Sequence, residues 1–137
     1  MRETPLDITD TIHYISLVNE MTSIKQNTKL FKALSDPNRL RILKMLQFKP
    51  MCVCEIREVL DLAVSTVSKH LSILKETGFI TEKKDGKWVN YLLNPVPKDP
   101  RISSVISTLD YWISDEKTTK QDQQKVQKAD RNIICSK

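Results

Sequence analysis

Two cysteines stand one residue apart at Cys52 and Cys54, and a third, Cys135, lies close to the end of the chain. Thiolates select soft ions such as As(III), Sb(III), Cd(II) and Pb(II). Because Pro50 ends the preceding helical pattern, a short helix is expected over residues 51–60, with Cys52 in its first turn. Unpaired N–H groups there lower the pKa of a thiol and favour the thiolate. The pair predicts a soft-ion site, with Cys135 as a candidate third ligand.

The spacing of the pair also raises a geometric difficulty. Positions i and i+2 of a regular helix point about 200° apart, so Cys52 and Cys54 reach one ion only if the first turn is distorted. Such a distortion is a candidate switch. Two alternatives stay open: an oxidant or persulfide can link two of the three thiols, or the paired cysteines can be small buried hydrophobic side chains.

Apolar residues recur every three or four positions along much of the chain, which predicts amphipathic helices. The stripe of the first helix, which runs from Ile8 to about Lys25, contains Ile8, Ile12, Ile15, Val18 and Met21. Further helices are expected at residues 28–34, about 38–47, 51–60 and about 63–77. The last two are joined by a tight turn and form a helix-turn-helix.

A β-hairpin is expected directly after these helices. Two strand-like runs, residues 79–84 and 87–92, flank Asp85-Gly86, a pair typical of tight hairpins because glycine supplies a positive φ. The period of two places Trp88 and Tyr91 on opposite faces, so one of them is expected to pack on the core. The predicted fold class is therefore mainly α with a small β-hairpin wing, a winged helix-turn-helix whose recognition unit covers about residues 51–93.

The second helix of this unit carries polar side chains on the face turned away from its apolar stripe. They are Ser65, Thr66, Ser68, Lys69 and Ser72, with His70 beside the stripe. Such side chains approach base edges and phosphates in a major groove about 12 Å wide. At the hairpin, Lys83, Lys84 and Lys87 can reach the neighbouring phosphate backbone. A solvated surface is the alternative, but the position of these residues in a winged helix favours DNA.

A last helix is expected before a polar tail. Its stripe contains Ile102, Val105, Ile106, Leu109, Trp112 and Ile113. We expect it to pair with the first helix in a homodimer, so residues 1–114 form the DNA-binding and dimerisation domain. Residues 115–137 are rich in Lys, Gln and Asp and are expected to be a flexible tail or a frayed helical extension.

Composition narrows the classes of function. The 137 residues fit one domain, and a net charge of +5 favours a polyanionic partner such as double-stranded DNA. No nucleophile stands at motif spacing from a histidine and a carboxylate, so an enzyme is not expected. The chain has no apolar run of roughly 18 to 20 residues and an odd number of cysteines, which predicts a cytoplasmic protein with reduced thiols and no membrane partner.

The chain resembles the ArsR family of winged-helix metalloregulatory repressors in several places. These are residues 30–43 (LFKALSDPNRLRIL), the CVCE run at 52–55, the STVSKHL run at 65–71 and the DGKWV wing at 85–89. The resemblance extends to about residue 93. It implies a homodimer that binds a palindromic operator and dissociates when a metal binds, and the CVC run is similar to that of arsenic- and antimony-responsive and of cadmium- and lead-responsive repressors.

Two departures from the family pattern bear on the ligands. The arsenic-repressor arrangement places a third thiol at residue 57, where this chain has Arg57. A three-sulfur site must therefore recruit Cys135 or a non-protein thiol, or stop at two ligands. The last helix also lacks the Asp-x-His and His-x-x-Glu pairs of zinc- and nickel-sensing relatives, so no zinc site is expected at the dimer interface.

These patterns together predict a repressor that As(III) or Sb(III) releases from its operator, with metal ligands Cys52, Cys54 and Cys135 and no organic cofactor. Cd(II), Pb(II) or a thiol oxidant are alternative inducers on the same scaffold. A third class stays open, in which the cysteines are inert and the stripe of the last helix binds another protein.

Overall fold

The computed structural model describes residues 8–135, apart from the side chains of Tyr14 and of residues 17–22. The predicted stripe positions Val18 and Met21 therefore lie outside the described side chains. The helices are α1 (Ile8–Thr22), α2 (Ile24–Leu34), α3 (Pro37–Phe48), α4 (Val53–Leu60), α5 (Val64–Glu76), α6 (Pro100–Ile113), α7 (Lys117–Lys128) and α8 (Arg131–Ile134). The strands are β1 (Met51–Cys52), β2 (Ile80–Asp85) and β3 (Trp88–Leu93).

Local sequence signals explain where α2 and α3 begin. The Ser23 side chain accepts a hydrogen bond from the backbone N–H of Gln26 and caps α2. The Asp36 carboxylate accepts from the N–H of Asn38 at 2.8 Å, and Pro37 occupies the first turn of α3. Both are preferred solutions for the unpaired donors of a helix N-terminus.

The three strands form one antiparallel sheet in the order β1-β3-β2. Asp85 pairs with Trp88, so the two residues of the hairpin turn are Gly86 and Lys87, and Gly86 has the required positive φ of 60°. The short strand β1 was not predicted; Met51 and Cys52 pair with Tyr91 and Asn90 on the opposite edge of β3. The sheet therefore links the start of α4 directly to the hairpin.

The buried side chains of helices α2 to α7 and of the sheet form one hydrophobic core. Its fully buried members include Ile42, Ile56, Leu71 and Phe79. Tyr91 packs against this core whereas Trp88 does not belong to it, so the prediction that only one of the two aromatic residues packs inward is confirmed. Within residues 8–135, no helix combines the length and the apolar character that a membrane span requires.

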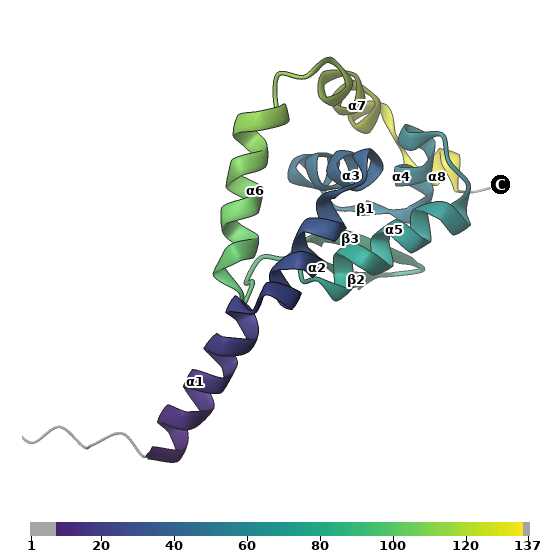
Figure 1. Cartoon of the computed structure of the whole chain (residues 1–137). Helices are drawn as coiled ribbons and strands as arrows, with labels where there is room; N and C mark the ends of the chain where they lie inside the picture. Colours follow the sequence, from purple (N-terminus) through teal and green to yellow (C-terminus); the bar gives the residue numbers. More distant parts are fainter. Residues whose placement is uncertain (1–7, 136–137) are drawn as a thin grey trace, which may run out of the picture.

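The first and last predicted helices leave apolar side chains exposed. Helix α1 projects away from the rest of the molecule, and α6 runs along one side of it (Figure 1). Ile8, Ile12 and Ile15 on α1 are 74%, 61% and 51% exposed, and Trp112 on α6 is 74% exposed. Ile102 and Leu109 of the α6 stripe are buried in the core. The predicted stripe of α6 is therefore divided between the core and the surface.

Residues 115–135 fold onto the domain, whereas their composition suggests a flexible tail or a frayed helical extension. Helix α7 packs on α3 and α4, and α8 packs on α4 (Figure 1). The Arg41 guanidinium donates to both carboxylate oxygens of Asp122 at 2.8 and 2.9 Å, and Val126 on the same face of α7 is buried. One partly buried ion pair and one buried valine anchor an otherwise polar helix, and this anchoring brings Cys135 back to the domain.

Candidate thiol site and DNA-binding surface

The three cysteines meet where β1 ends and α4 begins. The sulfur atoms of Cys52, Cys54 and Cys135 all lie within 4.8 Å of one another, and Cys52 Sγ is 3.9 Å from Cys135 Sγ. All three are free thiols in one chain. They are the only group of three or more His, Cys, Asp or Glu ligand atoms with this spacing in the described part of the chain. Three soft donors this close suit an ion that takes three thiolates.

The backbone at Cys52 removes the geometric difficulty of the pair. The sequence suggested that Cys52 lies in the first helical turn. In the structure it is instead the extended N-cap residue of α4, with φ −83° and ψ 166°. Cys54 is the second residue of the helix. The roughly 200° separation of helical positions i and i+2 does not apply across an N-cap. The two sulfurs therefore approach each other without a distorted turn, and the distortion expected as a switch is not needed.

Burial controls the acidity of two of the thiols. It raises the pKa of Cys52, and the backbone N–H of Glu55, which hydrogen-bonds to this sulfur, opposes the rise only in part. Burial also raises the pKa of Cys135 strongly, and its hydrogen bond with Cys54 and the proximity of Cys52 raise it further. Helix N–H groups were expected to lower the pKa of Cys52, but desolvation outweighs them because Cys52 is only 3% exposed.

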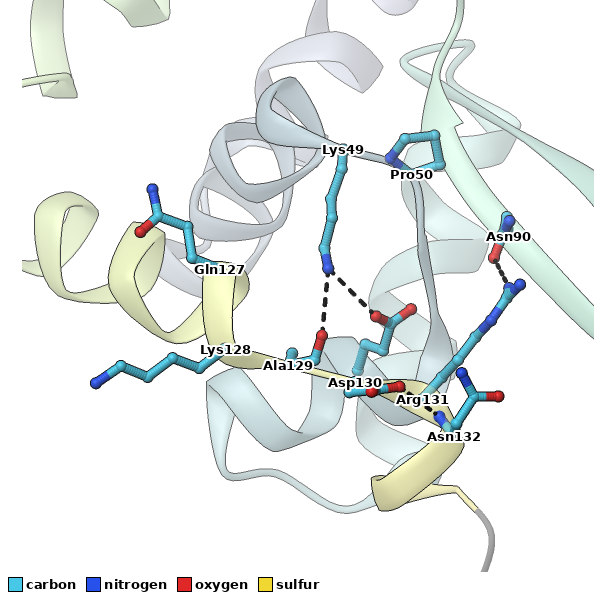
Figure 2. A pocket seen from close by; sticks show the side chains of 10 residues that line it. Lys49, Pro50, Asn90, Gln127, Lys128, Ala129, Asp130, Arg131 and Asn132 are labelled. Atoms are coloured by element: carbon cyan, nitrogen blue, oxygen red, sulfur yellow. Dashed lines mark hydrogen bonds and ion pairs between the residues drawn. The ribbon is translucent and has the colours of Figure 1, made fainter.

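A buried carboxylate fixes the shape of this N-cap. Glu55 is 6% exposed, and its Oε1 accepts a hydrogen bond from the Cys52 N–H at 3.0 Å. Its Oε2 lies 3.6 Å from Lys49 Nζ, which also donates to the Ala129 carbonyl at 3.3 Å. Figure 2 shows Lys49 reaching across a polar cleft towards the linker between α7 and α8. Sequence reasoning missed Glu55, although its position three residues after the N-cap is a capping-box signal.

A second missed residue, Arg131, joins α8 to the hairpin. Its guanidinium donates to Asp85 Oδ2 at 2.7 Å and to Asn90 Oδ1 at 3.0 Å, and it lies 5.5 Å from the centre of the Trp88 ring. Figure 2 shows the side chain pointing from the start of α8 to Asn90 on β3. No sequence signal relates residue 131 to residues 85–90, because the contact exists only once α7 is docked.

The predicted DNA-contacting side chains on α5 and the hairpin are exposed, except that of His70. On α5, Ser65, Thr66, Ser68, Lys69 and Ser72 are exposed, whereas Val67, Leu71 and Leu74 are buried. At the hairpin, Lys83, Lys84 and Lys87 are exposed. Hydroxyls and cations are thus placed on a recognition helix and a wing that follow one another in the chain, the arrangement that reads a major groove and its flanking phosphates.

His70 differs from its neighbours because it is half-buried and has a protein partner. Its Nδ1 lies 3.1 Å from Arg39 Nη1, and Arg39 also donates to the carbonyls of Ala33 and Lys32 at the end of α2. Because arginine is always a donor, Nδ1 accepts and the proton lies on Nε2. Arg39 therefore orients the recognition helix relative to α2 through His70, a role that the sequence did not reveal.

The comparisons with known proteins agree with this architecture. The family model described as "Bacterial regulatory protein, arsR family" matches residues 36–82. The arsenic resistance transcriptional regulator ArsR1 of Pseudomonas putida is 34% identical over 89 residues, which cover 62% of this chain and 70% of that protein. This chain belongs to the ArsR family. The family predicted from the sequence motifs is thus confirmed.

Other ArsR-family relatives carry metal-resistance names. The arsenical resistance operon repressor of Escherichia coli K12 is 41% identical over 68 residues, which cover 49% of this chain and 58% of the repressor. The cadmium resistance transcriptional regulatory protein CadC of Listeria innocua is 43% identical over 67 residues, which cover 48% and 56%. The chain therefore matches a little over half the length of each of these relatives.

Solved structures of similar proteins share the fold. The transcriptional regulator HlyU of Vibrio vulnificus is 30% identical, with a TM-score of 0.55 over 69% of this chain and 94% of that one. A homodimeric winged helix-turn-helix DNA-binding domain of Mycobacterium bovis, 17% identical, has a TM-score of 0.56 over 85% and 94%. The predicted winged helix-turn-helix is thereby confirmed, and the relatives are transcriptional regulators rather than enzymes, as expected.

Proposed function

We propose that this ArsR-family protein is a repressor that binds a palindromic operator as a homodimer and is released when As(III) or Sb(III) binds Cys52, Cys54 and Cys135. The observation that carries the proposal is the convergence of three thiols within 4.8 Å beside the recognition unit. The arsenical-resistance name of one relative supports the choice of ion. A regulator of this kind acts in the cytoplasm, where its operator is found.

The thiol cluster has a size suited to a three-coordinate ion. Sulfur ligands lie about 2.3 Å from ions such as zinc, so three evenly spaced sulfurs around one ion are at most about 4 Å apart. Cys52 Sγ and Cys135 Sγ, 3.9 Å apart, already satisfy this limit. Any other sulfur–sulfur distance that exceeds it, up to the 4.8 Å bound, would have to shorten. Ion binding would therefore contract the cluster. We expect Cys135 to be the ligand that moves, because it follows the four-residue helix α8, whereas Cys52 is held in the sheet and Cys54 in α4.

DNA binding is assigned to α5 and the hairpin. In a dimer, two copies of α5 about 34 Å apart would enter successive major grooves of two half-sites. Ser65, Thr66, Ser68, Lys69 and Ser72 would contact bases and phosphates, and Lys83, Lys84 and Lys87 the flanking backbone. His70 would contribute an Nε2–H to a phosphate while Arg39 holds its other nitrogen.

The test is a titration of the reduced protein against its upstream promoter duplex by fluorescence anisotropy, with and without stoichiometric As(III), Sb(III), Cd(II) or Pb(II). We expect As(III) to lower operator affinity about 5- to 150-fold, the range of ordinary allosteric couplings. Replacing Cys52, Cys54 or Cys135 by Ser should preserve DNA binding and abolish release. Lys69→Ala is the matched control, because it should weaken operator binding and leave As(III) binding intact.

The results separate the possible inducers. Release by Cd(II) or Pb(II) alone would keep the repressor and replace the ion. Operator binding that no ion alters would overturn ion sensing, and the absence of tight duplex binding at physiological salt would favour a protein-interaction module with inert cysteines.

The 3.9 Å separation of Cys52 Sγ and Cys135 Sγ also favours redox sensing as a second candidate. Peroxide would oxidise one thiol to a sulfenic acid with release of water, and attack by the other thiol would form a disulfide with release of a second water. Release by peroxide, reversal by dithiothreitol and no response to As(III) in reducing buffer would identify this mechanism.

A further inference from the structure

We propose that Arg131 is a latch between α8 and the wing that couples the thiol site to the DNA-contacting hairpin. The inference rests on the proposed function, because it explains how ion binding at Cys135 reaches the DNA surface. Arg131 would act as a positioning residue that binds neither the ion nor DNA.

Arg131 and Cys135 move together because they belong to the same helical turn. The Cys135 N–H donates to the Arg131 carbonyl at 2.9 Å. At the other end, the Arg131 guanidinium holds three residues of the hairpin: Asp85, Trp88 and Asn90. Asn90 also donates to Asp85 at 3.3 Å, so the contacts form one network rather than separate bonds.

The latch changes the charge that the wing presents to DNA. Asp85 precedes the hairpin turn and lies among the exposed Lys83, Lys84 and Lys87. The hydrogen bond from Arg131 holds the pKa of the Asp85 carboxyl below its ordinary value, so this carboxylate is charged and paired with Arg131. When Arg131 leaves, an unpaired carboxylate would face the phosphates next to the three lysines and weaken the wing contact.

Contraction of the thiol cluster would break this network. Its hydrogen bonds at 2.7 and 3.0 Å weaken steeply when the groups separate by about an ångström. To enclose an ion the cluster would shorten by up to nearly this distance, and Cys135, which follows the short helix α8, would carry α8 with it. A second ligand, Cys52, pairs with Asn90 in the sheet and stays with the hairpin. Ion binding therefore moves α8 relative to the residues that Arg131 grips.

One arm of the test measures coupling in the full-length protein with As(III) as the probe. Arg131→Ala should bind one As(III) per chain, detected by thiolate-to-arsenic absorbance, with unchanged stoichiometry. The factor by which As(III) raises the operator Kd should be about 2- to 30-fold smaller in this variant than in the wild type. Lys128→Ala removes an exposed charge from the adjacent end of α7 and should keep the wild-type ratio.

A second arm needs neither ion nor operator and separates the latch from the proposed function. The rate at which iodoacetamide alkylates Cys135, followed by peptide mass spectrometry, should rise several-fold in Arg131→Ala and in Asp85→Ala but not in Lys128→Ala. Operator DNA should slow this reaction in the wild type and not in Arg131→Ala, because coupling between two sites is reciprocal.

Each result bears on one of the two proposals. If As(III) and Cd(II) fail to release the wild type, ion sensing fails, and the alkylation rates alone decide the latch. If Arg131→Ala alkylates at the wild-type rate and shows the wild-type response to As(III), the latch is overturned while ion sensing stands.

Discussion

At the residue scale, protonation of the thiols distinguishes one inducer from another. Burial raises the pKa values of Cys52 and Cys135, so both are protonated at neutral pH. Cd(II) must displace each thiol proton that it replaces, whereas arsenous acid releases one water for each thiol and no net proton. We predict that Cd(II) affinity rises up to about tenfold per displaced proton for each pH unit, and that As(III) affinity is nearly constant from about pH 6 to 8.

Competition titrations at several pH values would measure both dependences. Cys135→Ser removes one proton from the Cd(II) equilibrium and should reduce the slope of log Cd(II) affinity against pH by about one. A Cd(II) affinity that does not change with pH would contradict protonated ligands.

The same thiols make the free energy of unfolding depend on pH in the alkaline range. A raised pKa means that the folded protein holds the proton more tightly than the unfolded chain, so this stabilisation is complete below the unfolded pKa of about 8.5. Above it, the unfolded chain loses protons first and the free energy of unfolding decreases. We predict this decrease in urea titrations of the reduced protein between about pH 8 and 9.5. Cys135→Ser should flatten the curve, and an equally steep curve would contradict the assignment.

At the element scale, α7 determines whether the third thiol is present at the site. Asp122 is 2% exposed and accepts two hydrogen bonds from Arg41 on α3. Asp122→Asn would remove the charge and one acceptor from a partly buried pair, which should cost about 1 to 3 kcal/mol of stability. We predict increased amide exchange over residues 117–135 and a weaker As(III) complex, while α5 still binds operator DNA.

Exchange measured by mass spectrometry, alongside As(III) titration, would check both effects. Asp115→Asn is the matched control, because it removes an exposed carboxylate just before α7. If Asp122→Asn binds As(III) as the wild type does, Cys135 reaches the site without the anchored helix.

The same helix shows where sequence reasoning reaches its limit. The helix-turn-helix and the hairpin follow from short-range signals, namely apolar periodicity and a turn glycine, and both were predicted. The docking of α7 depends on Arg41 and Asp122, which are 81 residues apart, and its only buried aliphatic residue is Val126. A polar helix with one such residue has the composition of a flexible tail, so its placement, and with it the position of Cys135 and Arg131, required the structure.

At the scale of the whole molecule, the exposed apolar surface indicates how two chains would associate in the proposed homodimer. Helix α1 carries Ile8, Ile12 and Ile15 in the open, and a mostly apolar groove beside α6 is lined by Phe31, Val105 and Trp112. In a monomer the apolar stripe of α1 would stay exposed to solvent. A second copy of the chain, related by a two-fold axis, can bury this stripe and the groove beside α6 at once.

If the proposed homodimer forms through this groove, we predict that Trp112→Glu makes the protein monomeric. The substitution places a carboxylate in the groove, where its burial in a dimer would cost several kcal/mol. Sedimentation should give a mass close to the 15.9 kDa of one chain, and operator affinity should fall steeply because a monomer engages only one half-site. The As(III) stoichiometry per chain should not change, since all three sulfurs come from one chain. Val96→Glu, which alters an equally exposed apolar residue in the linker before α6, should remain dimeric. If Trp112→Glu also remains dimeric and still binds a full operator, the two chains associate through another surface.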